Sequence, residues 1–86
     1  MTPSGLNAGA IKQQLRQYIC TELMQHPSYP LADNEPLMSG GLIDSFCVAY
    51  IGVFIEDRFH VYIPDTDLTV ESMDTLNQIA ARVLKG

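Results

Sequence analysis

The stretch that decides the fold lies at residues 40–59 and reads GGLIDSFCVAYIGVFIEDRF. A glycine pair opens it, and the apolar residues Leu42 and Ile43 lead into Asp44 and Ser45. Between Ser45 and Phe59 there is no proline, and apolar residues recur at helical spacing. Asp44 is a good N-cap because a carboxylate suits the positive end of a helix. The stretch therefore predicts a loop followed by a helix that begins at Asp44 and Ser45 and ends near Phe59.

The predicted helix is apolar on two faces. One face consists of Ala49, Gly52, Ile55 and Phe59. The other consists of Phe46, Tyr50, Val53 and Asp57. A helix with two apolar faces is either central or presents an adhesive surface, and a short chain buries little, so we expect the second face to be exposed. Gly52 in mid-helix costs about 1 kcal/mol relative to alanine, which predicts either close packing or space for a guest chain in the core.

On the N-terminal side, apolar residues recur every four positions and predict a helix over residues 8–25. These residues are Ile11, Leu15, Ile19 and Leu23, with Asn7 as the N-cap and Pro27 preventing continuation. We expect residues 1–7 to be flexible. Residues 26–43 contain three prolines and the glycine pair, so they predict a long loop. Its apolar residues are expected to pin it onto the core: Leu31, Leu37, Leu42 and Ile43.

On the C-terminal side, a loop containing Pro64 is predicted, with Ile63 as a core plug, followed by a short helix over residues 69–72. Thr75 and Gln78 form a capping box for a last helix that ends near Leu84. Its predicted buried face consists of Leu76, Ile79, Ala80 and Val83. No segment alternates as a strand does, so the chain predicts an all-α fold: one domain over residues 1–86, a small bundle of three longer helices and one short helix.

Composition narrows the function. The chain has 86 residues, ten acidic and five basic, for a net charge of −5. Proteins bind nucleic acids and anionic membranes through clusters of Lys and Arg. Because this chain is acidic, neither is an expected partner. Nine of the acids lie between Asp33 and Asp74, with Arg58 as the one base among them. That asymmetry has two explanations, a solvated surface or a docking face for basic partners.

The residues offer little for catalysis or metal binding. Cys20 and Cys47 form no CxxC pair and lie in apolar helical patterns, which predicts free thiols and no zinc site. His26 and His60 are expected in turns or at the surface. No GxSxG motif surrounds Ser45 and no histidine follows closely, so we expect no hydrolase triad and no catalytic role for Ser45. No signal pattern or bilayer-length apolar run is present, so a cytoplasmic location is expected.

Ser45 is expected in the first turn of a helix, where backbone amides and the helix dipole favour an attached phosphate. The string GGLIDSF at residues 40–46 resembles the phosphopantetheine attachment motif of acyl carrier proteins. The resemblance extends along most of the chain. The first helix, the loop with Leu37, the helix headed by Asp44 and Ser45, the IPD segment at residues 63–65, and the last two helices all fall at carrier-protein spacing.

The resemblance implies a specific chemistry. A phosphopantetheinyl transferase would attach 4'-phosphopantetheine from coenzyme A to Ser45, and Asp44 would orient the loop and assist this metal-dependent attachment. A ligase would load an acyl or aminoacyl group onto the arm as a thioester, and a synthase or transferase would use it. The chain itself would not be an enzyme. It would be a monomer and would tether the intermediate near partner active sites. Partner recognition is implied for Phe46, Tyr50, Val53, Glu56 and Asp57.

Departures from the family separate the possible pathways. Fatty-acid carriers usually have acids where this chain has Cys47 and Tyr50, which disfavours primary fatty-acid synthesis and predicts more apolar docking. We expect a polyketide or nonribosomal-peptide pathway. Residues 71–79, ESMDTLNQI, are similar to the matching stretch of D-alanine carrier proteins, so an aminoacyl carrier is the alternative within the family. Outside it, the alternative is an unmodified helical adaptor that uses Phe46, Tyr50 and Val53 to bind a partner.

Overall fold

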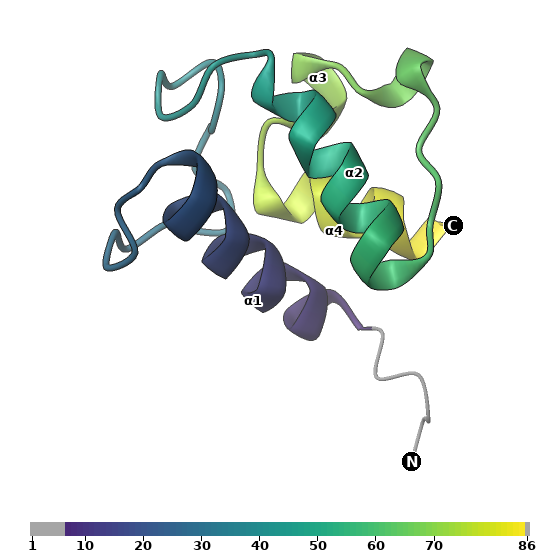
Figure 1. The fold of residues 1–86 in the computed structure, drawn as a ribbon, viewed down its shortest axis with the longest axis horizontal. Coiled ribbons are helices and arrows are strands. Elements are labelled where there is room, and N and C mark those ends of the chain that lie inside the picture. Colours follow the sequence, from purple (N-terminus) through teal and green to yellow (C-terminus); the bar gives the residue numbers. More distant parts are fainter. Residues whose placement is uncertain (1–6, 86) are drawn as a thin grey trace.

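The computed structural model describes residues 7–85, and these residues form helices and loops with no strand (Figure 1). The helices are α1 (Ala8–Tyr18), α2 (Cys47–Phe59), α3 (Val70–Met73) and α4 (Leu76–Lys85). The prediction of an all-α bundle with three longer helices and one short helix is therefore confirmed. The predicted flexibility of residues 1–7 concerns mostly residues 1–6, which lie outside the described part of the chain. Asn7 caps α1, since its side-chain oxygen accepts the amide of Ala10 at 2.9 Å.

The prediction of the first helix as one regular α-helix over residues 8–25 is wrong in its length and in its type of turn. After Tyr18 the chain continues as a π-helix, Ile19–Leu23, and the helical structure ends there rather than at Gln25. The wider turn is closed by the amide of Met24, which donates to the carbonyl of Ile19 at 2.8 Å. Gln25 then takes a left-handed conformation with φ of 56°, which reverses the chain two residues before Pro27. The extra residue in the turn rotates the end of the apolar stripe, so Leu23 is only half-buried.

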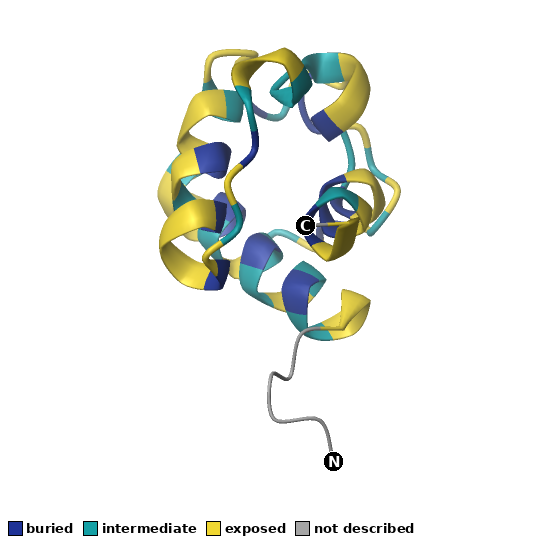
Figure 2. Ribbon diagram, turned by 90° about the vertical axis from the view of Figure 1, so that its right-hand side faces the viewer, coloured by how far each residue is buried: buried dark blue, intermediate teal, exposed yellow. Residues whose placement is uncertain are grey.

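One hydrophobic core joins the helices and the long loop. In Figure 2 the buried residues of the helices face the interior, while exposed residues cover the outside. The side chains that are completely inaccessible to solvent are Ile11, Leu15, Ile19, Leu37, Ile51, Ile55, Met73, Leu76 and Ile79. The predictions that Leu31, Leu37 and Ile43 pin the loop and that Ile63 plugs the core are confirmed, whereas Leu42 is half-buried. Leu37 lies in the loop before Ser45 and is fully buried, so it anchors that loop to the core.

The C-terminal elements follow the sequence closely. Thr69 caps α3, and the capping box of α4 is formed in both directions. The amide of Gln78 donates to the Thr75 hydroxyl at 3.1 Å, and the amide of Thr75 donates to the Gln78 side-chain oxygen at 3.2 Å. A 3-10 helix that the sequence analysis did not predict, Asp65–Asp67, precedes α3. Arg82 of α4 forms a salt bridge with Asp67 at 3.0 Å, which ties this segment to the bundle.

The interior face of α2 differs from its predicted composition. Gly52, Ile55 and Phe59 are buried as expected, but Ala49 is exposed and Ile51 is fully buried. A β-carbon built on Gly52 would lie 3.0 and 3.1 Å from the two δ-methyl carbons of Leu68. Of the two explanations for this glycine, close packing is therefore the one the structure supports. The neighbour is a side chain from the segment before α3, and no guest chain is needed to explain the small residue.

Replacing Gly52 by alanine should have an effect that depends on Leu68. In the parent chain, the gain in helix propensity of about 1 kcal/mol is offset by displacement of the Leu68 methyl groups. In a Leu68→Ala background that obstacle is absent, and Gly52→Ala should raise the free energy of unfolding by about 1 kcal/mol. Urea denaturation of the four proteins of this double-mutant cycle measures the difference. Equal effects of Gly52→Ala in both backgrounds would refute the packing explanation.

Candidate functional site

Ser45 lies in an exposed turn immediately before α2. The predicted N-cap role of Asp44 is wrong, because α2 begins at Cys47 and no side chain caps it. The carbonyl of Asp44 instead accepts the amide of Cys47 at 2.9 Å, and the carbonyl of Ser45 accepts the amide of Val48 at 3.3 Å. These bonds between residues three apart form a tight turn that uses the backbone of Asp44 and leaves its carboxylate exposed. The hydroxyl of Ser45 is consequently accessible at the entrance to the helix.

The backbone around Ser45 suits an attached phosphate. The amides of Asp44, Ser45 and Phe46 donate no hydrogen bond to an acceptor within residues 7–85. Helix α2 follows directly with 13 residues, so its positive end lies at this turn. Three consecutive unpaired N–H groups together with a helix dipole provide the donors that an anion at Ser45 would require. A phosphate ester on this hydroxyl therefore fits the residues present.

Two glycines shape the loop that leads to Ser45, and each is required for a different reason. A β-carbon on Gly40 would lie 2.3 Å from the carbonyl oxygen of Pro36, which is an impossible contact. Gly41 has a φ of 84°, a left-handed conformation that other residues rarely adopt. Beyond them, the amides of Leu42 and Ile43 both donate to the carbonyl of Leu37, at 2.9 and 3.1 Å. The glycine pair thus allows the chain to fold back around one buried leucine just before the serine.

A carboxylate far along the sequence holds this loop in place, and the sequence analysis missed it. Asp74, between α3 and α4, accepts hydrogen bonds from the amide of Met38 at 2.7 Å and the amide of Ser39 at 3.1 Å, and also from the Ser39 hydroxyl. Its own carbonyl accepts the amide of Leu37 at 2.7 Å. Partial burial alone would raise the pKa of the Asp74 carboxyl, but the bonds from Ser39 and Met38 outweigh it and lower the pKa. Asp74 therefore clamps the loop that presents Ser45.

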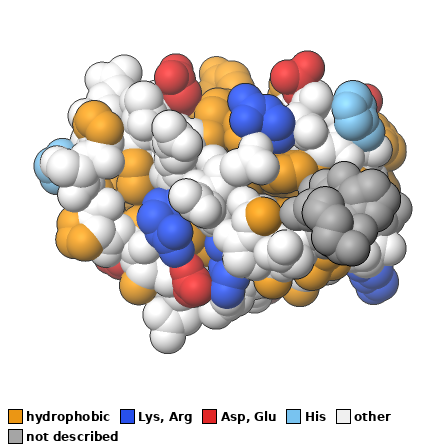
Figure 3. All heavy atoms as spheres, turned by 90° about the horizontal axis from the view of Figure 1, so that it is seen from below, with side chains coloured by type: hydrophobic (Ala, Val, Ile, Leu, Met, Phe, Trp, Pro, Cys, Tyr) orange, Lys and Arg blue, Asp and Glu red, His pale blue; other side chains and the backbone are white. Residues whose placement is uncertain are grey.

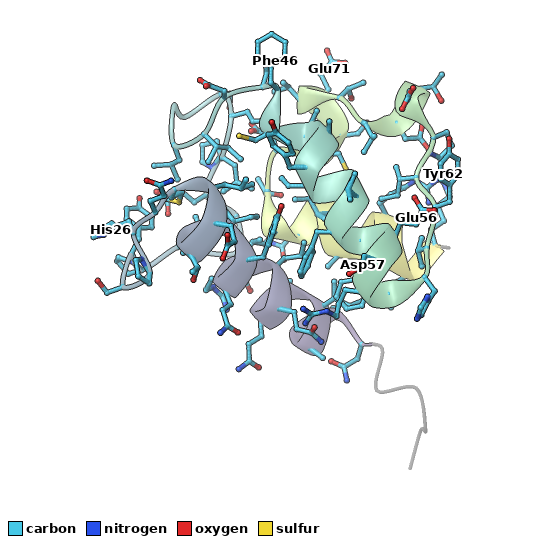
Figure 4. The ribbon with its side chains drawn as sticks, in the orientation of Figure 1. His26, Phe46, Glu56, Asp57, Tyr62 and Glu71 are labelled. Carbon is cyan, nitrogen blue, oxygen red and sulfur yellow. The ribbon has the colours of Figure 1, made fainter. Side chains whose placement is uncertain are left out.

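The predicted partner residues form an exposed face on α2. The exposed fractions of Phe46, Tyr50 and Val53 are 83%, 59% and 67%, which is unusual for large apolar side chains. Phe46 points away from the body at the end where α2 begins, and Glu56 and Asp57 lie toward the other end (Figure 4). A shallow hollow of about 360 Å³ lies between Val53, Glu56, Asp57 and His60. The structure thus places Tyr50, Val53, Glu56 and Asp57 on α2 and Phe46 at its N-cap position, with the apolar residues near Ser45 and the acidic residues farther along.

Some charged side chains of the described chain form salt bridges, and the acids of α2 do not. The cations Lys12 and Arg16 are paired with Asp33, and the hydrogen bond from Lys12, reinforced by Arg16, lowers the pKa of Asp33. Glu56 and Asp57, by contrast, form no ion pair with any residue in 7–85. On the face seen from below, basic side chains lie among hydrophobic and neutral ones and form no single cluster (Figure 3). The unpaired acids of α2 favour an approaching surface that carries positive charge.

Other site chemistries have little support among the described residues. Cys20 is buried and Cys47 is half-buried, and both are free thiols. No three His, Cys, Asp or Glu side chains in the described chain are arranged to hold a metal ion. Between residues 7 and 85 there is also no helix with the length and apolarity needed to cross a membrane. His26 lies at the far end of the molecule from α2 and contacts Tyr29.

No family model matches this chain, and no curated protein matches it in sequence. The carrier resemblance therefore rests on the quoted motif and its spacing. The structural features that bear on it are the exposed serine, the free amides beside it, the clamped loop and the apolar face of α2.

Proposed function

We propose that this chain is an acyl or aminoacyl carrier protein that bears 4'-phosphopantetheine on Ser45. The observation that carries the proposal is the exposed serine of GGLIDSF, held in a turn at the start of α2 beside three amides that donate to no acceptor within residues 7–85. When attached, phosphopantetheine supplies a terminal thiol that holds a cargo as a thioester. Gly40, Gly41 and Asp74 hold the loop that positions the serine. The amides of Asp44, Ser45 and Phe46 would donate hydrogen bonds to the phosphate.

Partner recognition is proposed for the exposed face of α2. Phe46, Tyr50 and Val53 offer apolar contact next to the attachment point. Farther along, Glu56 and Asp57 add negative charge that no cation within residues 7–85 neutralises in a salt bridge. Exposed aromatic side chains of this size are typical anchors of protein interfaces. Because the apolar part lies nearest Ser45, we propose a carrier of a polyketide or nonribosomal-peptide pathway. We also propose that it acts in the cytoplasm. The similarity of residues 71–79 to D-alanine carriers supports an aminoacyl cargo as the second candidate.

Incubation with coenzyme A, Mg²⁺ and a broad-specificity phosphopantetheinyl transferase tests the proposal. We expect the intact mass of the protein to rise by one phosphopantetheine group. The control is a known carrier protein treated with the same enzyme preparation, which establishes that the transferase is competent. If the control is modified and this chain is not, the carrier function is refuted. The exposed face would then favour an unmodified adaptor that binds through Phe46, Tyr50 and Val53.

Tyr50→Glu should impair docking without unfolding the helix, because the side chain is exposed and a charge there disrupts an apolar contact. We expect kcat/KM for loading by the transferase to fall on the order of tenfold, equivalent to about 1.4 kcal/mol. Circular dichroism should be unchanged. Tyr62→Glu is the matched control, since Tyr62 is 65% exposed and lies outside α2. Equal values of kcat/KM for Tyr50→Glu and the parent chain would show that this face does not bind the transferase.

A further inference from the structure

A cleft between α1 and α2 is separate from the exposed face described above. It has a volume of about 250 Å³ and none of the five proposed partner residues lines it. Its lining residues come from α1, the π-helix that continues it, and α2: Gln14, Gln17, Tyr18, Thr21, Glu22, Phe54 and Arg58. The cleft therefore combines two aromatic rings, several neutral hydrogen-bonding groups and one charge of each sign.

The aromatic part of the cleft is already ordered. The rings of Tyr18 and Phe54 stack with centroids 4.2 Å apart and planes inclined by 15°. Phe59 supports Phe54 from the core in an edge-on contact, with centroids 6.0 Å apart. Because each ring already packs against a neighbouring ring, a planar group in the cleft would contact the outer edges of a preformed aromatic cluster, at a small cost in side-chain entropy.

Arg58 is held over this surface with most of its donors unused. Its guanidinium carbon lies 5.2 Å from the centroid of the Phe54 ring, and it donates to the side-chain oxygen of Gln14 at 2.9 Å. Within residues 7–85 no carboxylate forms a salt bridge with it and no second acceptor is bound. A guanidinium has five N–H donors, so an oxygen acceptor can bind here without displacing an existing partner.

The cleft lies on the same side of α2 as a row that starts next to Ser45. Cys47, Tyr50, Phe54 and Arg58 follow one another at spacings of three or four residues, which places them along one side of the helix. Burial, and then the proximity of Glu22, Cys47 and Tyr50, raises the pKa of the Tyr18 hydroxyl, consistent with a ring that extends along this row. Phe54 lies about 10 Å along α2 from Cys47, the first residue of the helix, at 1.5 Å per residue.

The size of the cleft suits a compact aromatic cargo. A cavity of about 150 Å³ is enough to bind benzene, so a cleft of about 250 Å³ has room for an aromatic ring with a substituent. On the side of α2 that carries Gly52, the δ-methyl carbons of Leu68 occupy the space a β-carbon would need, so no guest chain passes between these two residues.

We propose that this cleft receives a planar aromatic acyl group carried on the arm of Ser45, with the ring against Phe54 and Tyr18 and a ring oxygen bound by Arg58. This inference rests on the proposed carrier function. It names the class of cargo, an aryl carboxylic acid with an oxygen substituent, and it makes Arg58 and Phe54 determinants of that preference.

Two loaded forms of the full chain test it. A permissive transferase supplied with 4-hydroxybenzoyl or hexanoyl coenzyme A attaches each acylated arm directly to Ser45. Nuclear Overhauser contacts between the aryl protons and the Phe54 ring, and a shift of the Arg58 Nε–H resonance, are expected in the aryl form only. Phe54→Leu should abolish the shift at Arg58, whereas Tyr62→Leu, at an exposed site outside the cleft, should leave it unchanged.

The outcomes separate the two proposals. If Ser45 is loaded and the aryl form shows no contact with Phe54, or if hexanoyl produces the same contacts, the cleft proposal is overturned and the carrier function stands. If neither coenzyme A thioester modifies the protein while a known carrier is modified, both proposals are overturned.

Discussion

Gly40→Ala should lower the free energy of unfolding by about 2–3 kcal/mol, because no small adjustment accommodates the new methyl group. Its β-carbon would lie 2.3 Å from the carbonyl oxygen of Pro36, a backbone atom that moves only with the loop. The displaced segment carries Gly41 and Leu42, and it leads into Ser45. We therefore also expect changed amide resonances at Ser45 and slower loading by the transferase. Urea denaturation and two-dimensional NMR measure both effects.

Gly9→Ala is the matched control for this substitution. Gly9 lies in the first turn of α1, where its nearest contact for a β-carbon is the Asn7 side-chain oxygen at 3.3 Å. Alanine has the higher helix propensity, so the change in stability should stay within about 1 kcal/mol and leave Ser45 unaffected. A Gly40→Ala protein as stable as the parent chain would contradict the described path of the loop.

Asp74→Ala should destabilise the protein by about 2 kcal/mol, since it removes a charged acceptor from the amides of Met38 and Ser39 and from the Ser39 hydroxyl. The freed loop should also load more slowly at Ser45. Glu71→Ala is the control, because Glu71 is an exposed acid nearby whose side chain accepts no hydrogen bond in the described chain. Its effect should be within about 0.5 kcal/mol. Equal stabilities for the two variants would show that Asp74 is no clamp.

The pH dependence of stability isolates the charge of Asp74. Its pKa in the folded protein lies below the ordinary value of 3.8, so the folded state binds fewer protons there than the unfolded state. The resulting stability is fully present above the ordinary value and is lost as pH falls through the lower, folded-state pKa. The difference in stability between the parent chain and Asp74→Asn should therefore be constant near neutral pH and shrink below about pH 4. A difference that does not change with pH would rule out the carboxylate as its source.

Regular patterns made the main helices predictable. The stripe of Ile11 and Leu15, the Thr75 and Gln78 box, and the apolar anchors of the long loop follow from spacing and local chemistry. The N-cap rule gave a wrong prediction at Asp44, where the backbone forms a turn before the helix begins. Asp44 looks like an N-cap, but its carbonyl closes a tight turn and α2 begins three residues later.

The features that the sequence did not predict are contacts between segments far apart in the chain. Nothing in the sequence near Asp74 indicates that it holds the loop at Met38 and Ser39, since such pairing depends on how α3 and α4 return to that loop. Likewise, Gly52 by itself allowed two explanations, and only the position of Leu68 selected one. The cleft between α1 and α2 also depends on helix placement, because Tyr18 and Phe54 are separated by the entire loop.

The most direct measurement is the intact mass of three proteins after treatment with coenzyme A and a competent phosphopantetheinyl transferase: the parent chain, Ser45→Ala and Ser72→Ala. Ser72 is also an exposed serine, so its replacement controls for modification elsewhere. We predict a gain of one phosphopantetheine in the parent chain and in Ser72→Ala, and no gain in Ser45→Ala. An unmodified parent chain, or a gain that persists in Ser45→Ala, would contradict a carrier function at Ser45.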